Sequence, residues 1–387
     1  AASTLADAAS TFNVTVPPDK ITTSTKYHVE LVDCGGAAPS GTAVAPRYPT
    51  TDDAALGART TGGLKIVVVP ISINNKGPAT TDAFYDPFRA YMLAMYPITS
   101  ISITAGTGIT VPPPPNTSGG SPDWTQLDWN GALDSMRTKR QADAPAADVY
   151  YFGMLMPTDT FQQYCGRGCT AGIGFVTSQN DASRRVAVGI GWSGNQALIT
   201  MAHEVGHNHG RNHAPCVPQG GSISGVDPMY PYDGASIGVW GYNAQSKQLV
   251  NPSGITDIMG YCNNQWISDY TYDGLVTRVA GVDAAARVFV NSDVLARWRT
   301  LLLDSRGPRW GLPSEDLEPP AGAAEVAQIF DEHGDVIDYV TVYRTEVSDI
   351  GAASIMVPEP QPGWYAIQVS GSVPHPFAAP VAVTRGF

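Results

Sequence analysis

The chain has 387 residues, of which 43% are hydrophobic and 15% charged, which is normal for a protein with buried cores and room for two domains. Its formal net charge of −12 and the lack of clustered Lys and Arg argue against a nucleic acid or an anionic membrane as partner. No apolar run reaches the roughly 18 residues that a membrane-spanning helix needs, so we expect no membrane span.

The N-terminal three quarters of the chain divide into an irregular segment and a segment in which strand-like and helix-like patterns alternate. Residues 1–60 are rich in Thr, Ala and Pro and predict an N-terminal extension or a propeptide-like segment. Residues 61–286 alternate between strand-like and helix-like patterns and predict a domain that contains both strands and helices. The predicted strands are 64–71, 99–106, 147–155, 172–178 and 184–192. The predicted helices are 85–96, 123–140, 195–210 and 266–281.

The pattern changes near residue 287, where short strands and turns replace the alternation. Strand-like segments recur up to residue 387, and His333-Gly334 is expected at the tip of a hairpin. Residues 287–387 therefore predict a β-sandwich-like module of about a hundred residues. The whole chain is expected to have an α+β fold.

The segment HEVGHNHGRNH, residues 203–213, holds four of the seven histidines of the chain. On a helix, His203 and His207 lie on one face and can both bind one metal ion, with Glu204 beside them. Gly210 can turn the backbone sharply out of the helix, which lets His213 return as a third ligand. The spacing predicts a Zn²⁺ site, with the carboxylate placed to act on a water molecule as general base.

The string HExxHxxGxxH resembles the active-site signature of the metzincin clan of zinc peptidases. Downstream, ITDIMGYC supplies Met259, which is similar in position to the methionine of the tight turn, the Met-turn, beneath the metal in that clan. Tyr261 is placed like a tyrosine that approaches the zinc in astacins and serralysins, where it helps to stabilise an oxyanion; a buried structural tyrosine is the alternative.

The resemblance covers roughly residues 60–285 and points to a bacterial reprolysin-like branch. Gly206 and Asn208 resemble the reprolysins, whereas Ala214, directly after the third histidine, departs from the named families. His209 is two residues from His207, so we expect it to face away from the metal and to pack.

The resemblance implies that residues 61–286 form a metzincin-like catalytic domain with a twisted mixed sheet, an active-site helix and the Met-turn. The segment 172–178 would be an edge strand that pairs with an extended substrate, or else a core strand. Four aromatic residues between His213 and Met259 are candidates for lining the specificity pocket, with ordinary packing as the alternative: Tyr230, Tyr232, Trp240 and Tyr242.

Five cysteines permit two disulfides. Cys216 follows the third expected ligand and Cys262 follows the methionine turn, so a bridge between them is geometrically sensible. Cys165 and Cys169 can close a small loop, with a second metal site as the alternative. Cys34 is then left over and is a candidate latency switch, a free buried cysteine, or a partner of one of the others.

The function that these features predict is that of a secreted zinc endopeptidase acting on protein or peptide substrates. The acidic, low-charge composition favours secretion, and because the first residues do not resemble a signal peptide, we expect that one has been removed. A glycoprotein- or mucin-directed protease is one alternative, and a binding or adhesion protein with an inactive peptidase domain is another. We expect a monomer whose C-terminal module binds substrate or another protein.

Overall fold

The computed structural model describes residues 4, 10–11, 14–30, 46–117, 119–166, 168–217, 223–286 and 295–377. The chain divides into two compact units, Ala1–Thr61 and Gly62–Phe387. In the first unit, a short 3-10 helix, η2 (Pro18–Lys20), precedes two antiparallel pairs of two-residue strands. These strands are β1 (Lys26–Tyr27) with β4 (Ala54–Ala55) and β2 (Val29–Glu30) with β3 (Arg47–Tyr48). Cys34 lies outside the described residues.

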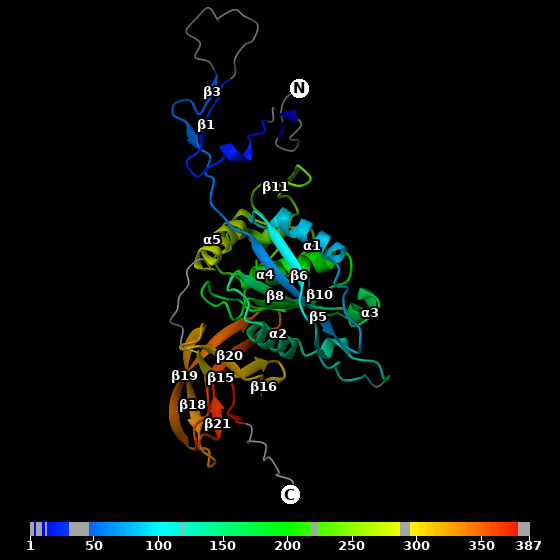
Figure 1. Ribbon diagram of the computed structural model, residues 1–387, viewed down its shortest axis with the longest axis vertical. Helices are drawn as coiled ribbons and strands as arrows, with labels where there is room; N and C mark the ends of the chain where they lie inside the picture. The colour runs from blue at the N-terminus through cyan, green and yellow to red at the C-terminus, as the bar shows by residue number, and fades with distance from the viewer. Residues whose placement is uncertain are drawn as a thin grey trace, which may run out of the picture. The chain divides into compact units, whose positions relative to one another are not determined.

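The second unit is built on a mixed six-stranded sheet with the order β6-β5-β8-β10-β9, in which β7 also pairs with β5 (Figure 1). Its strands are β5 (Leu64–Ser72), β6 (Ile101–Ala105), β7 (Ile109–Thr110), β8 (Val149–Leu155), β9 (Gly172–Gly174) and β10 (Val186–Ile190). All neighbours are parallel except β9, which runs antiparallel to β10 at the edge. The strand β10 is buried along its whole length, because helices cover both faces of the sheet.

Two layers of helices enclose this sheet. The long helices are α1 (Asp82–Met95), α2 (Trp129–Asp143), α4 (Asn195–Asn208) and α5 (Asp269–Ala286), and α3 (Phe161–Cys165) is a single turn. A Cβ built on Gly189 of β10 would meet Thr200 of α4, whereas one on Gly153 of β8 would meet Met136 of α2. Since Gly153 pairs with the neighbour of Gly189, α4 and α2 lie on opposite faces of the sheet. Among the described residues, no helix is long and apolar enough to cross a membrane.

Between α4 and α5 the chain forms short elements that lead back to the sheet. They are η4 (Asp233–Ala235), the hairpin β11 (Gly241–Asn243) with β12 (Gln248–Val250), and the parallel pair β13 (Thr256–Asp257) with β14 (Gln265–Trp266). A 3-10 turn, η3 (Trp124–Gln126), precedes α2, and Asp128 caps the helix by accepting a hydrogen bond from Gly131 N.

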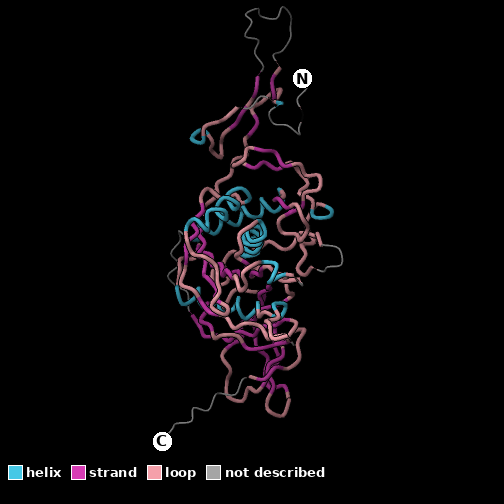
Figure 2. The backbone as a smooth tube through the Cα atoms, turned by 90° about the vertical axis from the view of Figure 1, so that its right-hand side faces the viewer, coloured by secondary structure: helices cyan, strands magenta, loops and turns pink. Residues whose placement is uncertain are grey.

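The C-terminal strands correct one prediction, because they form a single eight-stranded sheet and not the two sheets of a sandwich. The order is β16-β15-β20-β19-β18-β21-β22, with β17 also on β15. The strands are β15 (Leu295–Asp304), β16 (Gly307–Trp310), β17 (Ser314–Leu317), β18 (Ala323–Phe330), β19 (Val336–Val347), β20 (Ala352–Pro358), β21 (Ala366–Gln368) and β22 (His375–Pro376). In both views these strands lie together at one end of the unit (Figures 1 and 2).

Both faces of this sheet are apolar where they are buried, which explains why its sequence pattern resembles that of a sandwich. The register puts Leu301, Ile355 and Val342 on one face, and they belong to an apolar cluster of the module's own. Val347 and Ala352 point to the other face and belong to the core of the central sheet. A sheet whose faces are both covered shows the apolar content of a sandwich without a second sheet.

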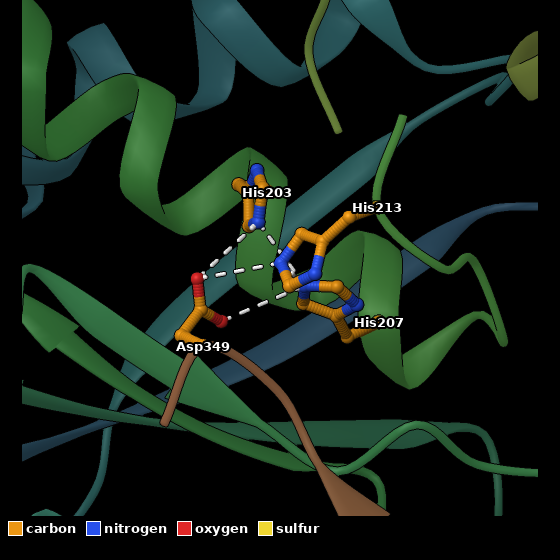
Figure 3. A group of neighbouring side chains, drawn as sticks. All are labelled: His203, His207, His213 and Asp349. Carbon is orange, nitrogen blue, oxygen red and sulfur yellow. Dashed lines mark hydrogen bonds and ion pairs between the residues drawn. The ribbon is translucent and has the colours of Figure 1, made fainter. Parts of the chain in front are cut away.

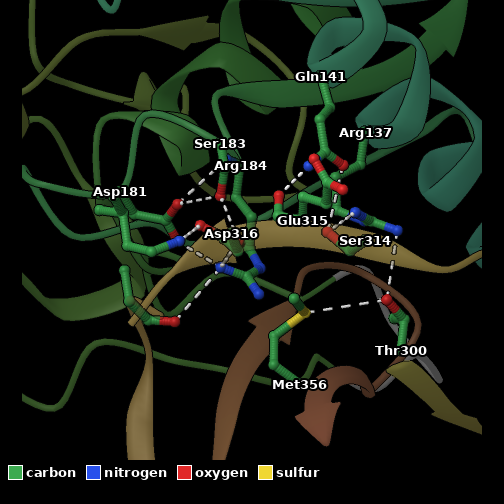
Figure 4. A network of polar contacts seen from close by, with 12 residues as sticks. Arg137, Gln141, Asp181, Ser183, Arg184, Thr300, Ser314, Glu315, Asp316 and Met356 are labelled. Carbon is green, nitrogen blue, oxygen red and sulfur yellow. Dashed lines mark hydrogen bonds and ion pairs between the residues drawn. The ribbon is translucent and has the colours of Figure 1, made fainter. Parts of the chain in front are cut away.

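Buried polar contacts join the C-terminal sheet to the central unit (Figure 4). Arg137 of α2 pairs with Asp134 at 2.8 Å and donates to Ser314 Oγ at 2.7 Å and to Thr300 Oγ1 at 3.2 Å. Its side chain is 2% exposed. Buried charges of this kind need complete pairing, so the module has one defined position against α2.

Candidate metal centre

Helix α4 and the turn that follows it bring three predicted ligands together. His203 and His207 lie one helical turn apart, and Gly210 has a φ of +77°, which reverses the chain after the helix. His213 then returns, and the Nε2 atom of His207 lies 3.0 Å from that of His203 and 3.2 Å from that of His213. All three imidazoles are buried. The local pattern of one helix and one glycine is thus enough to converge three nitrogen donors.

The contacts of the three Nδ1 atoms determine whether the facing Nε2 atoms carry a proton. Each Nδ1 lies against a backbone carbonyl oxygen that can only accept, at 2.7 Å for His203 (Ile258 O), 2.7 Å for His207 (Arg211 O) and 2.6 Å for His213 (Ser224 O). A neutral imidazole that donates through Nδ1 has a lone pair on Nε2. Burial lowers the pKa of His203 and His207, which favours this neutral form. Three lone pairs that face one another repel unless a cation lies among them, so the donor set fits a metal ion such as Zn²⁺.

Asp349 is a fourth group at this centre, and the sequence analysis did not identify it. Its carboxylate and the three imidazoles offer ligand atoms that all lie within 4.8 Å of one another. Figure 3 shows Asp349 facing the histidines from a separate segment of the chain. Tyr261 Oη donates a short hydrogen bond to Asp349 Oδ1. No spacing signal marks Asp349, because it lies on a hairpin turn of the C-terminal sheet far along the chain from the histidines.

Glu204 lies on α4 beside the converging histidines, and its side chain contacts the edge strand β9. It is 2% exposed, and a Cβ on Gly172 of β9 would come within 2.6 Å of its Oε1. Ser348 Oγ donates a hydrogen bond to Glu204 Oε2 at 3.2 Å. Burial raises the pKa of the Glu204 carboxyl well above its usual range, and the negative charge of Asp349 raises it further. The Glu204 carboxylate is therefore a stronger base than the carboxylate of a solvent-exposed glutamate.

Tyr261 and Met259 come from the turn after β13. Tyr261 Oη lies 3.2 Å from His213 Nε2, and burial raises the pKa of the phenol, which stays protonated and can donate. Met259 is 1% exposed and lies under the helix, since a Cβ on Gly206 would be 2.6 Å from its Sδ. The glycine of HEVGH thus allows a close contact with the methionine. Met259 O also accepts a hydrogen bond from Ala214 N at 3.0 Å, next to His213.

His209 is directed away from the three ligands. Its ring stacks on Tyr150 with centroids 4.7 Å apart, and its Nδ1 donates to Val205 O at 2.7 Å. Burial lowers the pKa of His209 to about 3. It is a neutral packing group between α4 and β8.

A cavity of about 810 Å³ opens beside the metal centre. Its lining includes His203, Glu204, Tyr261 and Asp349, together with residues 260–265. The four aromatic residues considered for the pocket are not part of this lining. They are Tyr230, Tyr232, Trp240 and Tyr242, and the first two donate to Ser236 O and to Asp269. The cavity is therefore lined by the turn after Met259 and not by these four aromatic residues.

The structure contains both disulfides that the cysteine positions suggested, Cys216–Cys262 and Cys165–Cys169. The first joins the segment after His213 to the segment after Met259, and Tyr261 N donates to Cys216 O at 3.0 Å. This bridge therefore ties together the two chain segments that supply the third histidine and the tyrosine.

Comparison with known proteins supports the motif. No curated protein matches this chain. Residues 120–214 match a family described as Metallo-peptidase family M12B Reprolysin-like. This range begins before η3 and α2, ends just beyond His213, and includes Glu204 and the three histidines that converge. The resemblance to the reprolysin-like metallopeptidases is therefore confirmed over residues 120–214, where three histidines converge in an arrangement that is consistent with a metal site.

Proposed function

We propose that this chain is a secreted zinc endopeptidase. The observation that carries the proposal is the convergence of three neutral Nε2 donors next to a buried glutamate and an 810 Å³ cavity. Three histidines are a common ligand set for a catalytic zinc ion. When bound there, zinc polarises the scissile carbonyl group and lowers the pKa of water. The family match and the metal-ligand cluster both support this reading.

The residues around the histidines have distinct tasks in this proposal. Glu204 accepts a proton from the attacking water and passes it to the nitrogen of the leaving amine. Tyr261 carries a protonated hydroxyl 3.2 Å from His213 Nε2, from where it can donate to the oxyanion that forms on the carbonyl. Met259 fills the space under α4 and supports the position of the ligands. His203, His207 and His213 hold the metal.

The remaining expectations are also proposals. Two disulfides favour an oxidising, extracellular compartment. We propose that residues 61–286 form a metzincin-like catalytic domain around the metal centre and that residues 287–387 form a module attached to it. A monomer and a substrate-binding role of the module stay predictions. An adhesion protein with an inactive peptidase domain is less favoured, because Glu204 and all three histidines are present and lie together.

The decisive experiment compares Glu204→Gln with the wild type and with Glu332→Gln, a change at an exposed glutamate of the β18–β19 hairpin. Glu204→Gln should retain zinc and lower the rate of peptide hydrolysis by about 10²–10⁴-fold, since it removes only the proton acceptor. Zinc is measured by metal analysis and activity by cleavage of casein and of a peptide library. Full activity of Glu204→Gln would refute the assignment, and a wild type that binds no zinc would refute the metallopeptidase.

A further inference from the structure

The turn between β19 and β20 carries Asp349 into the metal centre. It comprises Ser348–Gly351, and Asp349 has a φ of +65°, a left-handed conformation that Asp tolerates better than most residues. Asp349 Oδ1 lies 3.4 Å from His213 Nε2 and 3.8 Å from His203 Nε2. Asp349 Oδ2 lies 3.6 Å from His207 Nε2. The carboxylate therefore faces all three imidazoles at once (Figure 3).

One oxygen of this carboxylate has no hydrogen-bond donor among the described residues. Asp349 Oδ2 is buried and lacks such a partner. A buried anionic oxygen is costly unless a donor or a cation balances it. Since the facing Nε2 atoms carry lone pairs, they do not supply protons, and a shared cation is the group that balances both sides. Carboxylate oxygen is an accepted zinc ligand beside imidazole nitrogen.

The residues before Asp349 pair with the edge of the central sheet. Val176 N donates to Glu346 O at 3.1 Å, and Ser348 N donates to Gly174 O at 2.9 Å. Gly174 N also donates to Ser348 Oγ at 2.7 Å. These bonds extend the antiparallel edge at β9, the segment that the sequence predicts to bind an extended substrate by strand addition. A segment of the same chain thus uses the hydrogen-bonding groups that a substrate would need.

The turn is held in place by its own strands. Val347, at the end of β19, is 3% exposed, and Ala352, at the start of β20, is 1% exposed, both within the central core. Polar contacts also join the C-terminal sheet to the central unit, from Arg137 to Ser314 Oγ and from Arg184 to Asp316 (Figure 4). Moving Asp349 away from the histidines therefore disturbs the buried ends of β19 and β20.

We propose that Asp349 is a fourth protein ligand of the metal and that Glu346–Ser348 occupy the substrate strand position, so that the C-terminal module keeps this peptidase latent. The inference rests on the proposed function, because it assumes a metal held by the three histidines. The 810 Å³ cavity lets a small molecule approach the metal, where it must displace the Asp349 carboxylate, whereas Glu346–Ser348 keep a polypeptide from pairing with the edge strand. The activating event must displace the β19–β20 turn.

The test uses the full-length chain loaded with Zn²⁺ or with Co²⁺, whose visible spectrum reports its ligands. Asp349→Asn and Asp349→Gly remove the carboxylate, and both residues tolerate a positive φ, so the turn can still form. Asp338→Ala, at an exposed aspartate of the same β19 strand, is the matched control. The probe is acetohydroxamate, which competes with the Asp349 carboxylate for the fourth position on the metal and whose Kd is measured spectroscopically.

Both Asp349 variants should bind acetohydroxamate more tightly than the wild type and change the Co²⁺ spectrum. If the turn leaves the metal in about one molecule in 100, the apparent Kd of the wild type is weaker by about 100-fold. Casein cleavage should rise in parallel, and Asp338→Ala should match the wild type. In the wild type, acetohydroxamate should also speed hydrogen exchange at the Ser348 and Val176 amides.

Several outcomes would overturn the inference. One is a Co²⁺ spectrum and an acetohydroxamate Kd that are the same in wild type and Asp349→Asn. Loss of zinc or of existing casein cleavage in both Asp349 variants would show that Asp349 supports the active centre and does not block it. Absence of zinc from the wild type and from every variant counts against the proposed function itself, so the two failures are distinguishable.

Discussion

The Cys216–Cys262 bridge should contribute more to stability than the second disulfide, because it closes a much longer loop. The sequence separation is 46 residues for Cys216–Cys262 and 4 residues for Cys165–Cys169. In the chain-entropy description, these loops restrict the unfolded chain by about 4 and about 2 kcal/mol respectively. Replacing both cysteines of the long loop by Ala should therefore lower the free energy of unfolding by about 2 kcal/mol more than the same change in the short loop.

The assay is urea unfolding of the two double variants in the presence of a chelator, so that metal binding does not add to the measured free energy. The short-loop variant, Cys165→Ala with Cys169→Ala, is the matched control because it also removes one bridge. Equal losses for both double variants would refute the argument from loop length. The long-loop variant should also bind zinc more weakly, since Cys216 and Cys262 join the segments that carry His213 and Tyr261, whereas the control should keep its zinc affinity.

Two further predictions concern a glycine and a buried carboxylate. Gly210→Ala should destabilise the protein and lower zinc occupancy, because φ is +77° and the new Cβ would lie 2.9 Å from Thr177 O. The control is Gly334→Ala, where φ is +87° and the new Cβ would meet no atom within 4 Å. This control should lose only about 1–2 kcal/mol through backbone strain and should bind zinc as the wild type does. Equal zinc occupancy in both variants would contradict this. Burial alone would raise the pKa of Asp304, but hydrogen bonds from Arg306 and Arg309 outweigh it and lower the pKa to about 2. Its stabilising contribution is thus present above its usual pKa of 3.8 and lost as pH falls through 2. The urea midpoint should fall between pH 4 and pH 2 more steeply in the wild type than in Asp304→Asn. The same decrease in both proteins would contradict a stabilising role of the Asp304 carboxylate.

Five of the six strands of the central sheet could be predicted from short strand-like segments, with ends that differ by at most four residues, whereas β7 (Ile109–Thr110) was not predicted. The prediction of 64–71 differs by one residue from β5 (Leu64–Ser72). The helix predicted at 85–96 begins earlier, at Asp82, because Thr81 caps it by accepting a hydrogen bond from Phe84 N. The helix predicted at 123–140 is divided, because Asp128 caps a new start after η3. Caps act over one turn, so they shift boundaries without changing the type of element.

By itself, the sequence determined that the three histidines of α4 and of the turn after it converge. HEVGH places His203 and His207 on one helical face, and Gly210 allows the return of His213; these are relations over a few residues that helical geometry alone imposes. The tertiary structure decided where the C-terminal strands pair, that they form one sheet, and that Asp349 joins the metal centre. Strand pairing and hairpin placement depend on contacts between distant segments, and a period-2 apolar pattern carries no information about which distant surface will cover it.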